Sequence, residues 1–264
     1  MKKKTLDLLN QELDTHEYGL TSKVYTLQRL FDLYLKSEVE TLDDIFVNTE
    51  DFENFVMLNK DKFKYSFLEE FNDMLCCMVY AYNFAVSCAK MGYKEQNQFA
   101  DITKIVLPDD KMSVLDVGTG KIPISSYLLA KKYRKVTAMD QTHGQTIPYH
   151  SRFGVKFADE YFTPDTKISS YDALVGRRPC QAIPIMVETA AKMKKPYFID
   201  LCNCWASGES YFKIIRYLQD KDNKLRVNYR RPNPEKPDSV TVYIHNLELS
   251  SREIQDAMDS TELV

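Results

Sequence analysis

Residues 113–125 read SVLDVGTGKIPIS, which joins a short apolar run, two glycines and the beginning of a helix-like segment. The run VLDV is apolar and β-branched, as an interior parallel strand should be. Gly118 and Gly120 allow a tight turn and a close approach of the backbone to a ligand. The stretch therefore predicts a strand, a ligand-binding turn and a helix, in that order.

Short β-branched runs alternate with helix-like stretches from this segment onward. Such alternation indicates βαβ units and a parallel, doubly wound sheet. The last two runs are joined by PNPEKPD, which leaves no room for a helix, so we expect an antiparallel hairpin at the sheet edge. The expected strands lie in SVLDV, KVTAMD, GVKFA, YDALVG, PYFIDLC, LRVNYR and SVTVYIHNLE.

Residues 5–105 contain no proline and carry apolar residues at helical spacing. The sequence therefore predicts an α/β protein preceded by an all-helical N-terminal region. We expect a helical cap or substrate region over residues 1–105, a ligand-binding sheet domain over residues 106–250 and a C-terminal tail over residues 251–264. One or two N-terminal helices would then cover the ligand.

The composition is that of an ordinary globular protein, with 264 residues, 44% of them hydrophobic and 28% charged. A net charge of −3 gives no strongly basic face, so we do not expect a nucleic-acid partner. No uninterrupted run approaches the ~18 apolar residues of a membrane span, and the N-terminus lacks the apolar stretch of a signal peptide. We therefore expect a cytoplasmic protein without a membrane partner or a disulfide framework.

Two phosphate-binding motifs fail at the glycine turn. A P-loop requires G-x-x-x-x-G-K-[ST], but Gly120 and Lys121 are followed by Ile122. A dinucleotide fold places a third glycine where Ile122 stands, so that helix and pyrophosphate approach closely. The isoleucine thus favours a cofactor without phosphate. We expect the helix that begins near Pro123 to present free N–H groups to it.

The segment DVGTG, residues 116–120, resembles motif I of the class I, Rossmann-like methyltransferases that depend on S-adenosylmethionine. A second hallmark of that family is an acidic residue at the end of the next strand. Here KVTAMDQ supplies Asp140, twenty residues after Gly120. A carboxylate at that place accepts hydrogen bonds from both ribose hydroxyls. The resemblance covers about residues 106–250 and implies a Rossmann-like sheet with S-adenosyl-L-methionine as the cofactor.

The same family places a polar residue near the adenine after the third strand. FADEYF offers Asp159 or Glu160 there, with Tyr161 and Phe162 as ring contacts. The residues that the resemblance assigns to the cofactor are Asp116, Gly118, Thr119, Gly120, Asp140, Gln141, Asp159 and Glu160.

The acceptor of the methyl group should lie outside the carboxyl ends of the strands, after YDALV and FIDLC. GRRPC follows the first of these and lacks the Asn/Asp-Pro-Pro-aromatic motif of amino methyltransferases, which counts against DNA adenine methylation. Arg177 and Arg178 instead offer forked donors for a carboxylate or phosphate on a substrate; the alternative is that they pair with local acids or point to solvent. Catalytic residues stay unassigned, because methyl transfer from a sulfonium needs orientation more than a base.

Two further groups keep alternatives open. Cys180, Cys202 and Cys204 could meet at one rim and bind a soft metal, or simply be small residues at a tight edge, and we predict no metal site. His143 and His150 could line the cofactor mouth or serve packing.

The sequence thus predicts a methyltransferase acting on a small or medium-sized acceptor, with an anionic acceptor as one option. The alternative is a non-catalytic sensor or partner protein that binds S-adenosylmethionine or S-adenosylhomocysteine. Transfer of an aminopropyl arm ranks last, because GRRPC is basic and an amine substrate needs acidic groups. The acceptor atom and the oligomeric state are left open.

Overall fold

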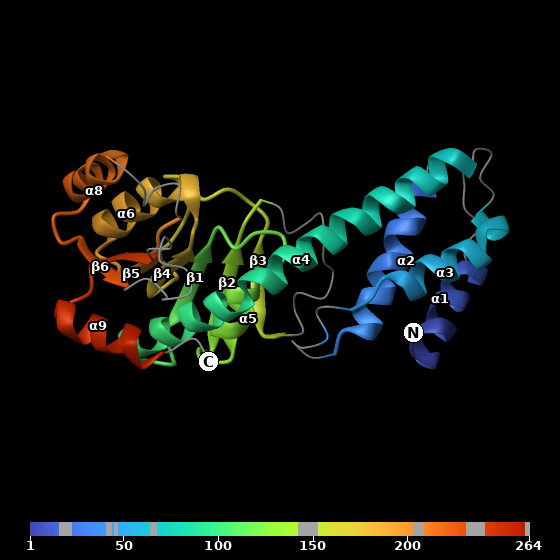
Figure 1. The fold of residues 1–264 in the computed structure, drawn as a ribbon, viewed down its shortest axis with the longest axis horizontal. Helices are drawn as coiled ribbons and strands as arrows, with labels where there is room; N and C mark the ends of the chain where they lie inside the picture. The colour runs from blue at the N-terminus through green and yellow to red at the C-terminus, as the bar shows by residue number, and fades with distance from the viewer. Residues whose placement is uncertain are drawn as a thin grey trace. The chain divides into compact units, whose positions relative to one another are not determined.

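The computed structural model of the chain describes residues 1–15, 23–40, 44, 47–63, 68–141, 153–202, 209–230 and 241–261 (Figure 1). These residues fall into two compact units that divide between Met91 and Gly92, inside the long helix α4 (Leu68–Val106). The domain boundary expected at residue 105 lies near the end of the same helix. The last turns of α4 belong to the sheet-containing unit because they pack against it.

The first unit is helical over its described residues. Its elements are α1 (Lys3–Thr15), α2 (Lys23–Glu38), α3 (Glu50–Leu58), the short 3-10 helix η3 (Lys60–Phe63) and the first part of α4. The centre is aromatic: the ring of Phe31 lies 5.0 Å from that of Phe52 and 5.3 Å, edge-on, from that of Tyr82. This unit therefore has a hydrophobic core of its own.

The second unit contains a seven-stranded sheet in the order β3-β2-β1-β4-β5-β7-β6. Strands β1 to β5 pair in parallel, whereas β7 is antiparallel to both β5 and β6. The predicted fold class, a doubly wound and mostly parallel sheet with an antiparallel C-terminal hairpin, is confirmed. The strands are β1 (Ser113–Val117), β2 (Lys135–Met139), β3 (Val155–Ala158), β4 (Ala173–Arg177), β5 (Tyr197–Asp200), β6 (Arg226–Arg230) and β7 (Thr241–His245).

The strand order reverses between β1 and β4, because the chain winds from β1 to β3 in one direction and continues from β4 in the other. In open sheets of this kind, the ligand crevice lies at such a reversal, outside the carboxyl ends of the strands. The turn after β1 and the loop after β4 therefore mark the place to look for a site.

Helices cover both faces of this sheet. Figure 1 shows α6 (Ile183–Met193) and α8 (Glu209–Lys221) on one side and α5 (Ile124–Ala130) and α9 (Ser251–Ser260) on the other. Successive residues of a strand face opposite sides. In β5, Tyr197 and Ile199 accordingly join the buried cluster with α6 and α8, while Phe198 stacks on Phe99 of α4 at 5.9 Å.

The expected C-terminal tail contains the helix α9 over its described residues. Ser250 caps its start: the Ser250 hydroxyl accepts a hydrogen bond from the Glu253 amide, and the Glu253 carboxylate accepts one from the Ser250 amide. Ile254 and Met258 are buried, and the Asn228 amide of β6 donates to the Ser251 carbonyl at 3.0 Å. The helix therefore completes one face of the sheet.

Helix α4 differs from one expectation. Over Asn72–Val106 it is long and apolar enough to cross a membrane, by length and composition alone. The expectation of no membrane span counted uninterrupted apolar runs only, and it stays a prediction, because length and composition do not show that this helix crosses a membrane. The last turns of this stretch are committed to the sheet unit, because Asp101 forms an ion pair with Lys132 and Phe99 stacks on Phe198.

Candidate functional site

The turn after β1 adopts a left-handed conformation at both of its glycines. Gly118 has φ +71° and Gly120 has φ +73°, a region that side chains with a Cβ rarely occupy. A Cβ on Gly118 would lie 2.7 Å from Cα of Pro179, whereas a Cβ on Gly120 would meet nothing within 4 Å. Gly118 therefore allows a close approach of two backbone segments, and Gly120 borders open space.

Asp140 is fixed beside this turn. The Gly120 amide donates to Oδ2 of Asp140 at 2.8 Å, and the Gly118 amide donates to the Met139 carbonyl at 2.9 Å. These two bonds extend the β1–β2 pairing into the turn. The Asp140 amide in turn donates to the Ala158 carbonyl at 3.2 Å, which brings the end of β3 to the same edge. The structure thus brings together the predicted glycine turn and the predicted acid after β2.

Asp116 lies inside the protein rather than at the surface of the turn. Its side chain is fully buried, and Oδ2 accepts hydrogen bonds from the hydroxyls of Ser125 and Ser126, both at 2.7 Å. Its Oδ1 has no hydrogen-bond partner. Burial raises the pKa of Asp116 to about 6, and the two serine bonds only partly oppose that rise. The Asp116 carboxyl group therefore anchors the first turn of α5 through these two serine hydroxyls.

The start of α5 corrects another expectation. The N–H groups of this helix start were expected to face a ligand, but one of them, the Ser125 amide, donates to Oε1 of Gln96 on α4 at 3.0 Å. Ile122 is buried and points into the protein. Because a protein side chain takes this amide and the Asp116 carboxyl lies beneath it, the helix start does not offer the anion site that a pyrophosphate needs.

The loop after β4 is strained and tightly packed. Arg178 has φ +56° and Cys180 has φ +42°, conformations that cost roughly 1–3 kcal/mol each for residues with a Cβ. Pro179, between them, packs on two glycines: a Cβ on Gly176 would lie 2.9 Å from its Cγ, and a Cβ on Gly118 would lie 2.8 Å from its Cβ. The turn after β1 and the loop after β4 are therefore locked together.

Arg177 and Arg178 contact two carboxylates, which was the alternative to substrate binding considered from the sequence. Arg177 forms an ion pair with Glu95, and its Nε lies 3.6 Å from Oδ2 of Asp200. The Nη2 of Arg178 lies 3.3 Å from Oε2 of Glu95, and its Nε lies 3.7 Å from Oδ2 of Asp200. These four residues, the arginine–carboxylate cluster, lie at the carboxyl ends of β4 and β5.

The position of the arginine–carboxylate cluster follows from the packing of α4. Asp200 lies two residues beyond Phe198, about 7 Å further along the strand and on the same face. Glu95 lies one turn before Phe99, about 6 Å back along the helix. Since Phe198 stacks on Phe99, Glu95 comes level with Asp200. Burial raises the pKa of Asp200 to about 6, although Arg177 and Arg178 oppose that rise.

The remaining predicted residues lie further out or outside the described residues. Gln141, Asp159 and Glu160 are exposed, and Thr119 is half-buried. Tyr161 is exposed and Phe162 is buried in the core. His143, His150 and Cys204 lie outside the described residues, while Cys180 is exposed and Cys202 is half-buried. Among the described residues, no group of three or more His, Cys, Asp or Glu residues is arranged to hold a metal ion.

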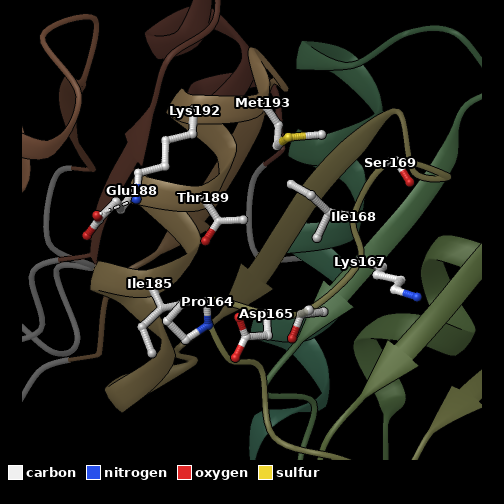
Figure 2. Close-up of a pocket in the computed structure, with 11 residues that line it drawn as sticks. Pro164, Asp165, Lys167, Ile168, Ser169, Ile185, Glu188, Thr189, Lys192 and Met193 are labelled. Carbon is white, nitrogen blue, oxygen red and sulfur yellow. Dashed lines mark ion pairs between the residues drawn. The ribbon is translucent and has the colours of Figure 1, made fainter.

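A separate pocket of about 330 Å³ lies beside α6 (Figure 2). Figure 2 shows Ile185, Thr189 and Met193 of this helix facing a chain segment that includes Ile168. Glu188, at its edge, forms an ion pair with Lys192 at 2.8 Å. The pocket contains none of the residues assigned to the cofactor, so it is distinct from the turn after β1.

Sequence reasoning missed five residues of this region: Glu95, Gln96, Ser125, Ser126 and Asp200. One of them carried a signal. Asp200 ends the buried strand PYFID, just as Asp140 directly follows the strand KVTAM, and the same rule would have selected it. Glu95 and Gln96 lie in a continuous helical pattern, and only the packing of α4 brings them here.

No protein-family model and no curated protein sequence matches the chain. Solved structures do resemble it, and three examples follow.

The chain is 14% identical to a 1,6-didemethyltoxoflavin-N1-methyltransferase of Burkholderia thailandensis solved with S-adenosylhomocysteine, over 69% of this chain and 90% of that one, with a TM-score of 0.45. It is 14% identical to the precorrin-6y C5,15-methyltransferase of Geobacter metallireducens, over 56% and 85%, with a TM-score of 0.40. It is also 14% identical to an rRNA methylase of Streptococcus thermophilus, over 58% and 93%, with a TM-score of 0.40.

The strand order of the chain itself places it in the Rossmann-like α/β class. The similar structures include both small-molecule and rRNA enzymes. The expectation that nucleic acid is not the substrate therefore stays a prediction.

The two glycines of the turn make a matched pair for a stability test. Gly118→Ala should lower the free energy of unfolding by about 3 kcal/mol, because the new Cβ meets Pro179 and the φ angle is unfavourable. Gly120→Ala should lower it by only about 1 kcal/mol, because it meets nothing. Urea unfolding followed by circular dichroism measures both, and equal losses would contradict this packing.

The buried Asp116 predicts a pH dependence of stability. Its pKa is raised from 3.8 to about 6, so its contribution is complete below pH 3.8 and is lost as the pH rises through 6. Asp116→Asn cannot ionise and keeps an oxygen for both serines. Relative to this variant, the wild-type protein should lose about 3 kcal/mol of stability between pH 3.8 and pH 7.5.

Urea unfolding at several pH values measures that difference between wild type and variant. The exposed Asp256→Asn on α9 is the control and should follow the wild-type profile. A constant difference between wild type and Asp116→Asn across this range would contradict the raised pKa.

Proposed function

We propose that the protein is an S-adenosylmethionine-dependent methyltransferase acting on a small or medium-sized acceptor. The observation that carries the proposal is the hydrogen bond from the Gly120 amide to the Asp140 carboxylate, at 2.8 Å. It joins the two motif elements at the carboxyl ends of β1 and β2, next to the reversal of strand order. That is where an open α/β sheet binds its ligand.

The residues present fit this cofactor better than a nucleotide with phosphates. Gly120 borders open space, as a turn that cradles a ligand requires. The Asp140 carboxylate stands where ribose hydroxyls can donate to it. At the start of α5, Gln96 takes the Ser125 amide and the Asp116 carboxyl binds the Ser125 hydroxyl, so this helix start is poorly suited to a phosphate.

The glycine turn, Asp140 and the loop after β4 each have a role in the proposed mechanism. When bound, S-adenosylmethionine supplies a methyl group already activated on a sulfonium. The glycine turn and Asp140 hold the cofactor, and the loop after β4 orients the acceptor and excludes water. Orientation and water exclusion are the main demands of such a displacement, so no general base is assigned. The cap formed by N-terminal helices and the cytoplasmic location stay predictions from the sequence.

The cofactor assignment is tested by two variants at one position. Asp140→Asn keeps an oxygen for the Gly120 amide but loses the charge, and S-adenosylmethionine binding should weaken about 10-fold. Asp140→Ala removes the acceptor both for the Gly120 amide and for the ribose hydroxyls, and S-adenosylmethionine binding should weaken up to about 100-fold. Isothermal titration calorimetry measures both affinities. The exposed Asp220→Asn on α8 should bind like the wild type, and wild-type affinity in both Asp140 variants would overturn the assignment.

Catalysis is separated from mere binding by following the product. The protein, incubated with S-adenosylmethionine and a cell extract divided into small-molecule and RNA fractions, should produce S-adenosylhomocysteine with the small-molecule fraction. Product formed only with the RNA fraction would show that the acceptor is an RNA and would contradict a small-molecule acceptor. Tight cofactor binding with no product in either fraction would favour the non-catalytic binding protein.

A further inference from the structure

The arginine–carboxylate cluster brings two like charges together at the end of β4. Successive residues of a strand normally point to opposite faces. Arg178 departs from that rule through its positive φ of 56°, and its guanidinium contacts the same Glu95 and Asp200 as Arg177 does. Burial is the main cause that lowers the pKa of Arg177, and repulsion from the nearby Arg178 lowers it further, while Asp200 and Glu95 oppose the shift. A strained loop thus holds two guanidinium groups side by side.

The hydrogen bonding of the cluster is incomplete. Asp200 is 4% exposed, and its Oδ1 has no hydrogen-bond partner. Nε of Arg177 and Nε of Arg178 are also buried without a partner, because their distances of 3.6 and 3.7 Å to Asp200 are too long for hydrogen bonds. Buried polar atoms without partners are uncommon and mark places where a further group can bind.

The two carboxylates of the cluster differ in how easily a ligand could displace them from the arginines. Asp200 is fixed in the interior at the end of β5. Glu95 is 44% exposed and lies on the solvent side, where its Oε2 contacts both guanidinium groups. A carboxylate oxygen shared by two arginines, on a side chain that is partly exposed, is the position that a carboxylate or phosphate of a ligand would occupy.

The cluster also borders the proposed cofactor site. Pro179, which follows the two arginines, packs directly against Gly118 of the turn after β1. A ligand held by Arg177 and Arg178 therefore lies on the loop that is locked to the cofactor turn.

We propose that Arg177 and Arg178 bind an oxyanion group of the methyl acceptor, a carboxylate or a phosphate, and that Glu95 occupies this position until the acceptor displaces it. The assignment of this ligand as the acceptor rests on the proposed methyltransferase function. The binding of an oxyanion at the cluster does not.

The test is a calorimetric titration of the full chain with benzoate and with phenyl phosphate. The wild-type protein should bind one of them saturably, with a dissociation constant in the millimolar range, while neutral benzamide should not bind. Glu95→Gln removes the competing charge and should tighten that binding about 10-fold. Arg178→Gln should weaken it about 10-fold or more.

The matched control is Asp101→Asn, which breaks another ion pair of the same helix, that with Lys132. It should leave oxyanion affinity unchanged, and circular dichroism should show all variants folded. Preference for phenyl phosphate assigns a phosphorylated acceptor, and preference for benzoate assigns a carboxylic acid.

Three results would overturn the proposal: no saturable binding of either anion to the wild type, equal binding of benzamide, or an affinity in Glu95→Gln no higher than in the wild type. S-adenosylmethionine affinity, measured in the same samples, keeps the two proposals apart. If the wild-type protein binds phenyl phosphate but not S-adenosylmethionine, that result would support the oxyanion site and contradict the proposed methyltransferase function.

Discussion

A proline ring packed between two glycines organises this site. Pro179 contacts Gly118 after β1 and Gly176 at the end of β4 so closely that neither glycine could carry a Cβ. This contact sets the turn that brings the Gly120 amide to Asp140, and it sets the strained loop that turns Arg178 toward Glu95. The turn after β1 and the loop after β4 therefore depend on one packing constraint at the reversal of strand order.

The last turns of α4 supply the polar groups that define the site's chemistry. Gln96 takes the Ser125 amide at the start of α5, and Glu95 contacts the two arginines. The first of these contacts makes the helix start unattractive to phosphate. The second places one carboxylate against the two arginines of the loop after β4. Adjacent residues of one helix thus contact the start of α5 and the loop after β4 through different neighbours.

Two buried acids give the site its electrostatic character. Burial raises the pKa values of Asp116 and Asp200 to about 6, but their surroundings differ. Asp116 accepts hydrogen bonds from two serine hydroxyls behind the turn after β1. Asp200 instead lies beside the guanidinium groups of Arg177 and Arg178 at the loop after β4. Ionisation of a buried carboxyl group without a nearby cation lowers the free energy of unfolding. Ionisation of Asp116 should therefore lower the stability of the fold more than ionisation of Asp200.

The sequence by itself determined the strands, their mostly parallel pairing and the hairpin, because these follow from alternating apolar runs and the length of their connections. It also determined the glycine turn and Asp140, since both occupy fixed places at strand ends. Only the tertiary structure decided that Ser125 faces Gln96, that Arg177 and Arg178 share Glu95 and Asp200, and that α4 divides between two units. These features depend on how a helix distant in sequence packs against the sheet, and residue spacing along one chain segment carries no information about that packing.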